Sequence, residues 1–294
     1  MNRLFLFFVI GVVLICSEVL SAYPFRSKYF IAVKNQGENI LDSLEDHHAF
    51  LPPRNRFYAD PILFKYQGIN YLFFEDYDYV KGIISYTTID ENLQFTKVEK
   101  ALELPCHLSF PYVFEDNGTI YMIPETFQMK EVSLFKAIEF PGKWEKVKTL
   151  VQGEPFVDSI VFQHGGYYWL FTSSASTGSR MFIYYATSLE GDFSPHPMNK
   201  KEIPGRNAGP LFYYEGSLVR PVMDNQEVYG KAMILKEIVH LDPTRFEERD
   251  IRRIDPTWAP KLTGTHTLNM HNDLVVYDGR RDIHVSEDPF YSAP

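Results

Sequence analysis

Residues 59–77 read ADPILFKYQGINYLFFEDY, two apolar runs separated by a polar turn at Gln67 and Gly68. Runs rich in β-branched and aromatic residues around a glycine turn are typical of a β-hairpin. The same pattern returns without gaps in residues 109–127, 157–175 and 207–225, and in weaker form in residues 265–281. A β-rich unit that recurs about every 50 residues predicts a repeat architecture.

Weaker strands are predicted between the copies, in residues 82–88, 131–137, 180–187 and 230–236. A more polar stretch follows each one, such as residues 94–98 in the first unit. Four antiparallel strands per unit and five units predict an all-β, five-bladed β-propeller. Strand 29–34 belongs to no copy, and we expect it to complete the last blade and close the ring. The alternative, a β-sandwich, has no repeat of fixed length.

Composition narrows the class of ligand. The 294 residues carry a net charge of −9, which disfavours binding to nucleic acid. Aromatic residues make up 16% of the chain, and several recur with the repeat, as Phe64, Phe114, Phe162 and Phe212 do. We assign these to packing between blades, which leaves few aromatic side chains to stack on a ligand.

The first 22 residues have the three parts of a signal peptide: a basic start at Arg3, an apolar run in residues 4–15 and small residues up to Ala22. The apolar run is shorter than the roughly 20 residues of a spanning helix. We therefore expect a secreted or periplasmic monomer, with the propeller in residues 23–281 and a tail in residues 282–294. An uncleaved membrane anchor is the alternative. Cleavage leaves only Cys106, which excludes an intramolecular disulfide.

Acidic residues recur at one end of the predicted hairpins. A turn centred between Gln67 and Gly68 places Asp60 opposite Glu75. The same arithmetic places Phe110 opposite Glu125 and Asp158 opposite Ser173. Asp224, His266 and Asp278 fall at the corresponding end of the last two units. Crowded carboxylates raise one another's pKa, so a shared rim suggests a functional pocket, although any single acid could instead cap a strand or turn.

A pocket with several carboxyl groups suits glycoside cleavage, which uses one carboxyl group as general acid and another as base or nucleophile. His266 is either a ligand of a cation in the channel or a structural histidine. The expected substrate-binding residues are Glu75, Tyr58, Phe110, Arg206, Arg220, Asp224 and Asp278.

Several longer strings are shared with a known family: FYADPILF (57–64), LSFPYVFEDNGTIYMIPE (108–125), DSIVFQHGGYYWLFTSS (158–174) and AGPLFYYEGSLVRPVMDN (208–225). They resemble the N-terminal propeller domain of plant glucosamine inositolphosphorylceramide transferases, over residues 28–281. That domain is similar in turn to glycoside hydrolase families 43, 32 and 68. In the plant family glycosyl transfer is attributed to a separate C-terminal domain, so the resemblance carries only the propeller.

The hydrolase resemblance implies roles for individual residues. Those families use an Asp base or nucleophile on blade one, a supporting Asp on blade two and a Glu acid on blade three. Asp60 matches the first, Asp158 stands at the third, and Phe110 replaces the supporting acid unless Glu125 takes its place. His266 resembles a channel histidine near a bound Ca²⁺, which is the one cofactor expected.

The resulting hypothesis is a carbohydrate-active propeller that cleaves or transfers a glycan through Asp60 with Asp158 or Glu125. Its expected ligand is a carbohydrate or a glycolipid. A non-catalytic glycan-binding propeller is the alternative, and a purely structural or interaction propeller is a third.

Overall fold

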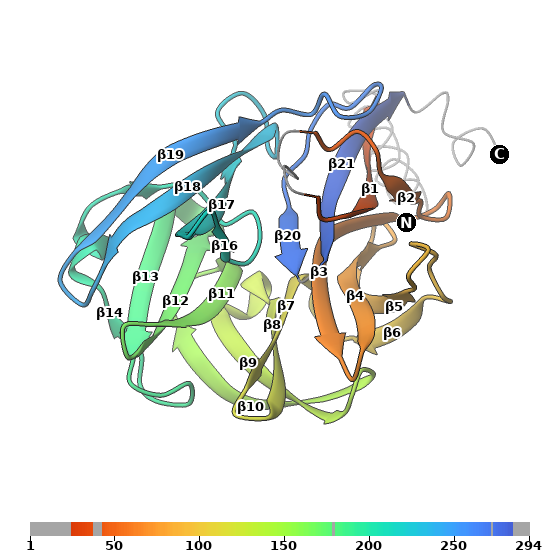
Figure 1. The fold of residues 1–294 in the computed structure, drawn as a ribbon. Helices are drawn as coiled ribbons and strands as arrows, with labels where there is room; N and C mark the ends of the chain where they lie inside the picture. Colours follow the sequence, from red (N-terminus) through yellow and green to blue (C-terminus); the bar gives the residue numbers. More distant parts are fainter. Residues whose placement is uncertain (1–24, 38–42, 178–179, 272, 285–294) are drawn as a thin grey trace, which may run out of the picture.

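The computed structural model describes residues 25–37, 43–177, 180–271 and 273–284, and it contains five antiparallel sheets arranged as the blades of a ring (Figure 1). The predicted five-bladed β-propeller is confirmed. The first blade comprises β3 (Phe57–Tyr66), β4 (Ile69–Tyr77), β5 (Gly82–Ile89) and β6 (Glu99–Leu102). The second comprises β7 (Ser109–Asp116), β8 (Thr119–Glu125), β9 (Glu131–Glu139) and β10 (Lys143–Gln152).

The later blades keep the same order from the channel outward. The third comprises β11 (Phe156–His164), β12 (Tyr167–Ser174), β13 (Arg180–Ala186), β14 (Ser194–Pro195) and the extra β15 (Ile203–Pro204). The fourth comprises β16 (Phe212–Tyr214), β17 (Ser217–Asp224), β18 (Ala232–Leu241) and β19 (Phe246–Ile254). Short 3-10 helices interrupt the loops: η1 (Phe127–Met129), η2 (Ala175–Thr177) and η3 (Pro197–Lys200).

The fifth blade joins the two ends of the chain. It consists of β20 (Leu268–His271), β21 (Leu274–His284), β1 (Phe25–Asn35) and β2 (His48–Phe50). β1 pairs with β21 along its whole length, from Phe25 opposite His284 to Asn35 opposite Leu274 (Figure 1). The N-terminal strand therefore closes the ring as predicted, and β2 adds a further strand that the sequence pattern did not indicate.

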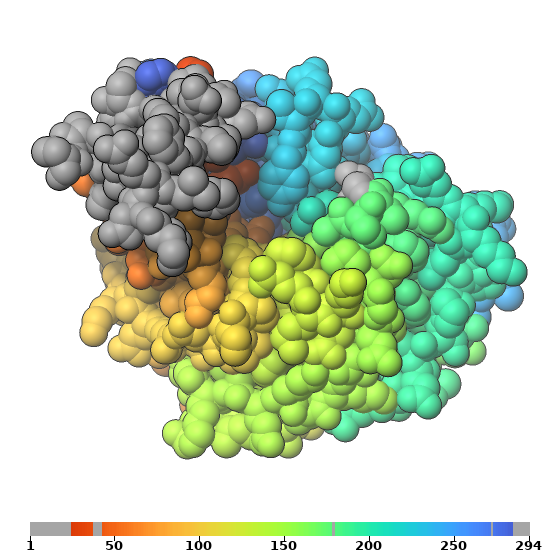
Figure 2. All heavy atoms as spheres, turned by 180° about the vertical axis from the view of Figure 1, so that it is seen from behind, coloured from red at the N-terminus to blue at the C-terminus, as the bar shows by residue number. Residues whose placement is uncertain are grey.

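Apolar side chains fill the spaces between neighbouring blades. Trp169 and Phe171 of blade three are fully buried in one cluster, which also holds Phe110 of blade two. The recurring Phe64 and Phe212 are buried, and Phe114 and Phe162 pack against inter-blade clusters. Seen from behind, successive blades follow one another around the ring from yellow through green to cyan (Figure 2). The aromatic excess is thus mainly packing, as the repeat predicted.

The first strand of blades one to three carries a β-bulge at the same repeat position. In blade one Ala59 pairs with Glu75, but the next pair is Ile62 with Phe73, so one extra residue is accommodated. The register shifts likewise after Ser109 and after Val157. The residue at each bulge has a left-handed backbone, with φ of 53° at Asp60, 42° at Phe110 and 50° at Asp158.

The bulges correct the predicted hairpin register. Asp60 does not pair with Glu75, and the predicted partners of Phe110 and Asp158 are also wrong by one residue. The physical reason is the left-handed residue, which inserts an unpaired position that a pattern of period two cannot reveal.

The outer strand of blade one is also displaced from its prediction. Residues 94–98 are irregular apart from a bridge between Phe95 and Ile89, and the outer strand follows at β6. The Asp90 carboxylate accepts hydrogen bonds from the amides of Asn92 (2.9 Å) and Gln94 (2.8 Å), which turns the chain there. Among the described residues no helix is both long and apolar enough to cross a membrane.

Candidate functional site

A cavity of about 350 Å³ lies at the bulged ends of the innermost strands, where all five blades meet. The structure brings six of the sequence-predicted residues together in its wall: Asp60, Glu75, Glu125, Asp158, Arg206 and His266. Other residues complete the wall, namely Tyr29, Phe57, Ala59, Tyr77, His107, Ser109, Phe127, Val157, Ala175 and Tyr229.

The bulges link the carboxyl groups of successive blades. The amide of Asp60 on blade one donates to Asp278 Oδ2 of blade five at 3.4 Å. The amide of Phe110 on blade two donates to Asp60 Oδ2 at 3.2 Å. The amide of Asp158 on blade three donates to Glu125 Oε2 of blade two at 3.2 Å. Each bulge thus turns one backbone N–H toward the acid of the preceding blade.

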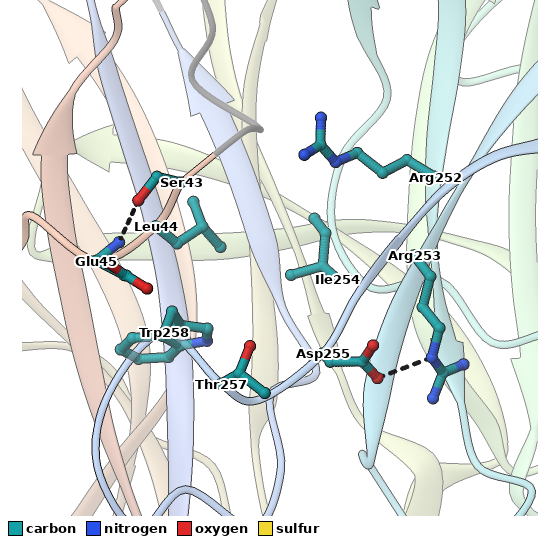
Figure 3. A pocket seen from close by; sticks show the side chains of 9 residues that line it. All are labelled: Ser43, Leu44, Glu45, Arg252, Arg253, Ile254, Asp255, Thr257 and Trp258. Atoms are coloured by element: carbon teal, nitrogen blue, oxygen red, sulfur yellow. Dashed lines mark hydrogen bonds and ion pairs between the residues drawn. The ribbon is translucent and has the colours of Figure 1, made fainter.

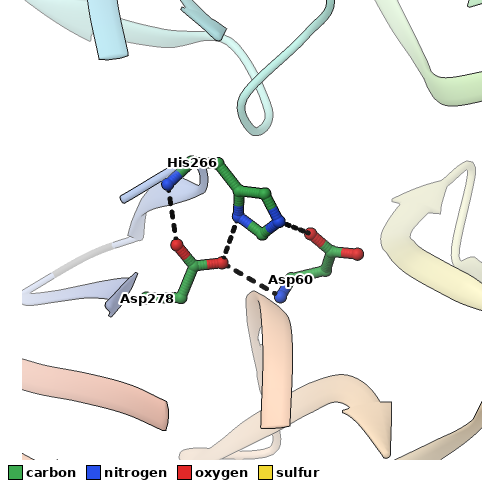
Figure 4. A group of neighbouring side chains, drawn as sticks. All are labelled: Asp60, His266 and Asp278. Carbon is green, nitrogen blue, oxygen red and sulfur yellow. Dashed lines mark hydrogen bonds and ion pairs between the residues drawn. The ribbon is translucent and has the colours of Figure 1, made fainter. Parts of the chain in front are cut away.

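His266 lies between two buried aspartates (Figure 4). Its Nδ1 is 2.5 Å from Asp278 Oδ2, and its Nε2 is 3.9 Å from Asp60 Oδ1. Burial alone would lower the pKa of His266, but Asp278 and then Asp60 raise it to about 9. The ring is therefore an imidazolium at neutral pH.

These residues do not fit a directly coordinated Ca²⁺, although Asp60, His266 and Asp278 form a compact cluster of potential ligands. Calcium takes about six to eight oxygen ligands, whereas the His266 side chain offers only nitrogen. Asp278 Oδ1 already accepts the amides of His266 (2.9 Å) and Thr267 (3.1 Å), and Asp60 Oδ1 accepts Thr267 Oγ1 (2.9 Å). The imidazolium supplies the positive charge that a cation would supply.

Glu75 has a partner that sequence reasoning missed. His107 Nε2 lies 3.1 Å from Glu75 Oε1, and His107 Nδ1 accepts the Gly82 amide at 2.9 Å. This fixes the proton on Nε2, which donates to the carboxyl group. Burial, followed by the charge of Asp60, raises the pKa of Glu75 well above its usual value. Burial lowers the pKa of His107, so the ring is neutral at neutral pH.

Asp158 and Glu125 share a cation. Arg206 donates a short hydrogen bond from Nε to Asp158 Oδ2, and its terminal nitrogen lies 3.8 Å from Glu125 Oε2. Burial, with the neighbouring charge of Asp158, raises the pKa of Glu125 well above its usual value. Asp158 is therefore the closer partner of Arg206, and the raised pKa of Glu125 favours its protonated form.

Aromatic rings form the remaining wall. Tyr29 stacks on His266 with ring centroids 4.7 Å apart, and Tyr229 meets the same ring edge-on at 5.5 Å. Phe57 contacts Tyr29 and Tyr77, with ring centroids 5.2 Å and 4.9 Å apart. A signal for two of the missed residues exists in the repeat, because Phe57 and His107 stand two positions before their copies, 50 residues apart.

Two predicted binding residues face the core. Tyr58 packs against Phe50 and Phe74, since strand alternation directs Phe57 and Ala59 to the cavity and Tyr58 to the opposite face. Phe110 is fully buried between blades, and it reaches the site only through its amide. Their placement at the pocket was wrong.

Three other predicted residues also lie outside the cavity wall. Arg220 is fully buried in blade four, where it binds Glu248 at 2.8 Å and Asn207 Oδ1 at 3.1 Å. Asp224 binds Arg253 at 2.5 Å, beside a different hollow. Asp278 lies behind His266 and holds it in place. The repeat aligned these positions correctly along the strand, but it could not show which way each side chain points.

A second, smaller hollow of about 150 Å³ lies between the end of β19 and the segment before β2 (Figure 3). Its Arg253 pairs with Asp255 at 2.8 Å as well as with Asp224. Its Ser43 Oγ accepts the amide of Glu45 at 3.2 Å. Arg253 is thus held by carboxylates of the protein itself, and the described residues that line the hollow include no cluster of buried acids like that of the main cavity.

Comparison with solved structures identifies the architecture. A family 117 glycoside hydrolase from the marine bacterium Zobellia galactanivorans aligns with a TM-score of 0.57 at 12% identity, over 86% of this chain and 90% of its own. The α-L-arabinofuranosidase PaAbf62A from Podospora anserina aligns with a TM-score of 0.55 at 12% identity, over 72% and 75%. At such low identities the likeness shows a glycoside-hydrolase-like propeller fold and no more.

Sequence comparison identifies the family. Residues 46–258 match the family described as glucosamine inositolphosphorylceramide transferase 1, N-terminal. The transferase of that name from Arabidopsis thaliana is 34% identical over 210 residues, which cover 67% of this chain and 27% of the plant protein. The protein from Oryza sativa subsp. japonica is 33% identical over 207 residues, 66% and 28% of the two chains. The matched region spans about a quarter of these relatives' length, and the chain belongs to the family of glucosamine inositolphosphorylceramide transferase 1 N-terminal domains.

Proposed function

We propose that the protein is an exported carbohydrate-active propeller that cleaves or transfers a glycan bound in the main cavity. The observation that carries the proposal is the wall itself, in which acids of unlike environment face one another beside aromatic rings. Burial raises the pKa of Glu125 and Glu75 well above the usual value, and it raises the pKa of Asp60 as well, but at Asp60 the charge of the His266 imidazolium acts in the opposite direction. Environments that separate the pKa values of paired carboxyl groups suit acid and base roles.

The proposed mechanism uses Glu125 as general acid and Asp60 as base or nucleophile. Glu125 gives its proton to the leaving glycosidic oxygen, and Asp60 acts on the opposite side of the sugar ring. Asp158 is not the acid in this scheme, because its Oδ2 accepts a short hydrogen bond from Arg206 Nε. Arg206 instead orients Asp158 and holds Glu125 near the cavity. Tyr29, Phe57 and Tyr77 offer ring faces and edges to a sugar.

A non-catalytic glycan-binding propeller is the second candidate, and one observation favours it. Both oxygens of Asp60 are already engaged, Oδ2 by the Phe110 amide and Oδ1 by Thr267 Oγ1. A carboxylate held this firmly serves to position a ligand as readily as to attack one. The plant relatives are named for a transferase, and this chain matches only their N-terminal domain.

The test combines a glycan array with a cleavage screen of polysaccharides and glycolipids, on the full chain. Glu125→Gln is expected to retain glycan binding and lose cleavage by about 10²–10⁴-fold, as removal of a general acid does. Asp60→Asn is expected to lose cleavage as well. Asp224→Asn, outside the cavity wall, is the matched control. Binding without cleavage by the wild type supports the second candidate, and absence of both excludes the proposal.

Export is proposed from the first 22 residues, which lie outside the described part of the chain. Expression from the native start, followed by N-terminal sequencing of the protein in each cell fraction, tests it. The expected mature N-terminus is Tyr23. An intact N-terminus on protein in the membrane fraction would support the anchor instead.

A further inference from the structure

Three loops carry exposed apolar side chains at their tips. They surround the mouth of the main cavity, the cavity of about 350 Å³ lined by Asp60 and Glu125. Each loop joins the second strand of a blade to the third: β4 to β5, β8 to β9 and β17 to β18. Val80 is 86% exposed, Met129 46% and Val228 46%. Their loops or adjoining strands also supply Tyr77, Phe127 and Tyr229 to the cavity wall, which places the three tips on the cavity face.

The loops share a composition as well as a position. Residues 78–81 read DYVK, 127–130 read FQMK and 228–231 read VYGK, so each combines an aromatic residue, an apolar tip and a lysine. Lys81 pairs with Glu103 at 2.9 Å, while Lys130 is exposed. Apolar and aromatic side chains with flanking lysines are the composition of segments that lie in a membrane interface.

Other exposed apolar residues of the described chain are distributed differently. Ile69 and Tyr213 lie at hairpins on the opposite face, and Val239 and Ile251 lie in the outer strands β18 and β19. Phe25, 58% exposed, adds to the cavity face, because β1 begins where β21 ends. Isolated surface residues need no explanation, but apolar tips gathered around one opening do.

We propose that the cavity face docks on the surface of a lipid bilayer through the tips of Val80, Met129 and Val228. A lipid surface provides apolar contact for separated tips and leaves polar headgroups opposite the acid-lined opening. The docking goes beyond the proposed function and depends on the loops alone.

The N-terminal sequence is consistent with this orientation. The apolar run of residues 4–15 lies ten residues before Phe25, a distance of at most about 35 Å in an extended chain. Since Phe25 lies on the cavity face, an uncleaved run held in a bilayer would keep this face, and not the opposite one, near the membrane, whereas cleavage after Ala22 leaves the docking to the three loop tips alone.

The experiment places a reporter on one tip of the full chain. Val80→Trp is mixed with phosphatidylcholine vesicles that contain phosphatidylglycerol, with and without brominated acyl chains. Val239→Trp, 53% exposed in β18, is the matched control on an outer strand. Tryptophan at position 80 is expected to shift to the blue and to be quenched by the brominated lipid, and tryptophan at position 239 to do neither. Equal quenching at both positions, or none at either, overturns the proposal.

A second variant separates lipid docking from self-association. Val80→Asp, Met129→Asp and Val228→Asp, combined in one protein, are expected to weaken vesicle binding by at least about tenfold, because apolar area is no longer buried. Circular dichroism checks that the variant is folded. If the substitutions leave vesicle binding unchanged and instead dissociate an oligomer seen by light scattering, the face is a protein interface and the proposal is wrong. The glycan array measures glycan binding in the cavity independently of vesicle binding. Failure of one proposal therefore does not imply failure of the other.

Discussion

The most consequential single residue is His266, a buried cation between Asp60 and Asp278. Sequence alone left it as either a ligand of a cation in the channel or a structural histidine. Its two ring nitrogens face carboxylates, and the aspartate oxygens accept amide and hydroxyl donors. The His266 side chain therefore supplies a positive charge between the two aspartates at the centre of the propeller.

Replacing this cation should destabilise the fold strongly. His266→Gln leaves two buried carboxylates without their counter-charge, which costs about 3–5 kcal/mol of the free energy of unfolding. Urea denaturation at neutral pH measures it. His240→Gln is the control, because His240 forms a similar pair with Asp242 at 2.6 Å but in an exposed position. Similar small losses in both variants would contradict the assigned role.

The same residue sets a pH dependence. The pKa of His266 is raised to about 9 in the folded protein from about 6.5 in the unfolded chain, so its contribution to stability is complete below about 6.5. It is lost as the pH rises through about 9. The raised pKa values of Glu75 and Glu125 act in the same direction. Wild-type stability is expected to fall between neutral and alkaline pH, and His266→Gln to show a shallower decline.

At the scale of elements, the β-bulge is the feature of the repeated hairpin that organises the cavity. A regular hairpin would direct every second side chain toward the channel and leave all amides in the ladder. The bulge releases the amides of Asp60, Phe110 and Asp158, and each then binds an acid of the preceding blade. Packing between blades and organisation of the cavity thus depend on the same positions.

Close approach of backbones between blades four and five gives a testable requirement. Gly209 has φ of 139°, and a Cβ there would lie 1.9 Å from the carbonyl oxygen of Leu268. Gly209→Ala is expected to cost about 3 kcal/mol or more, from both the clash and the backbone. Gly216→Ala, at a turn with φ of 82° and open space around it, is the control, with a cost of about 1–2 kcal/mol. Thermal and urea unfolding measure both, and equal losses would contradict the clash.

The repeat in the sequence predicted the blades, the closing strand and the rim at which Asp60, Glu75, Glu125, Asp158, Arg206 and His266 gather. It could not predict the bulges, because a left-handed residue such as Phe110 leaves no mark in an apolar pattern. It also could not orient Tyr58, Arg220 or Asp224, since a position one residue along a strand faces the other side. His107 was missed because its only signal is a shared repeat position with Phe57, a residue of a different type outside the acidic pattern.

At the scale of the molecule, integrity depends on the joint between the two ends of the described chain. β1 is the central partner of the fifth blade, bonded to β21 on one side and to β2 on the other. Among the strands of the described residues, only β1 covers the edge of β21 that β20 leaves open. The cavity depends on this joint too, because Tyr29 of β1 and His266 before β20 both line it.

Removal of that joint should abolish folding. Deletion of residues 1–35 removes all 11 residues of β1 and exposes the edge of β21, so aggregation or an unfolded chain is expected. Deletion of residues 1–24 leaves every described strand intact and is the control. Circular dichroism and size-exclusion chromatography distinguish the outcomes. A folded, monomeric product of the longer deletion would show that the ring does not need β1.

The joint also dictates an order of events during biosynthesis. The pair Phe25 and His284 is separated by 259 positions, so the first strand to leave the ribosome awaits the last. Until then the ring stays open, and every contact of the fifth blade that involves β21 is unmade. Contacts between residues so distant in sequence form slowly, because a long loop must close first. A nascent chain of this kind cannot close its ring until β21 has left the ribosome.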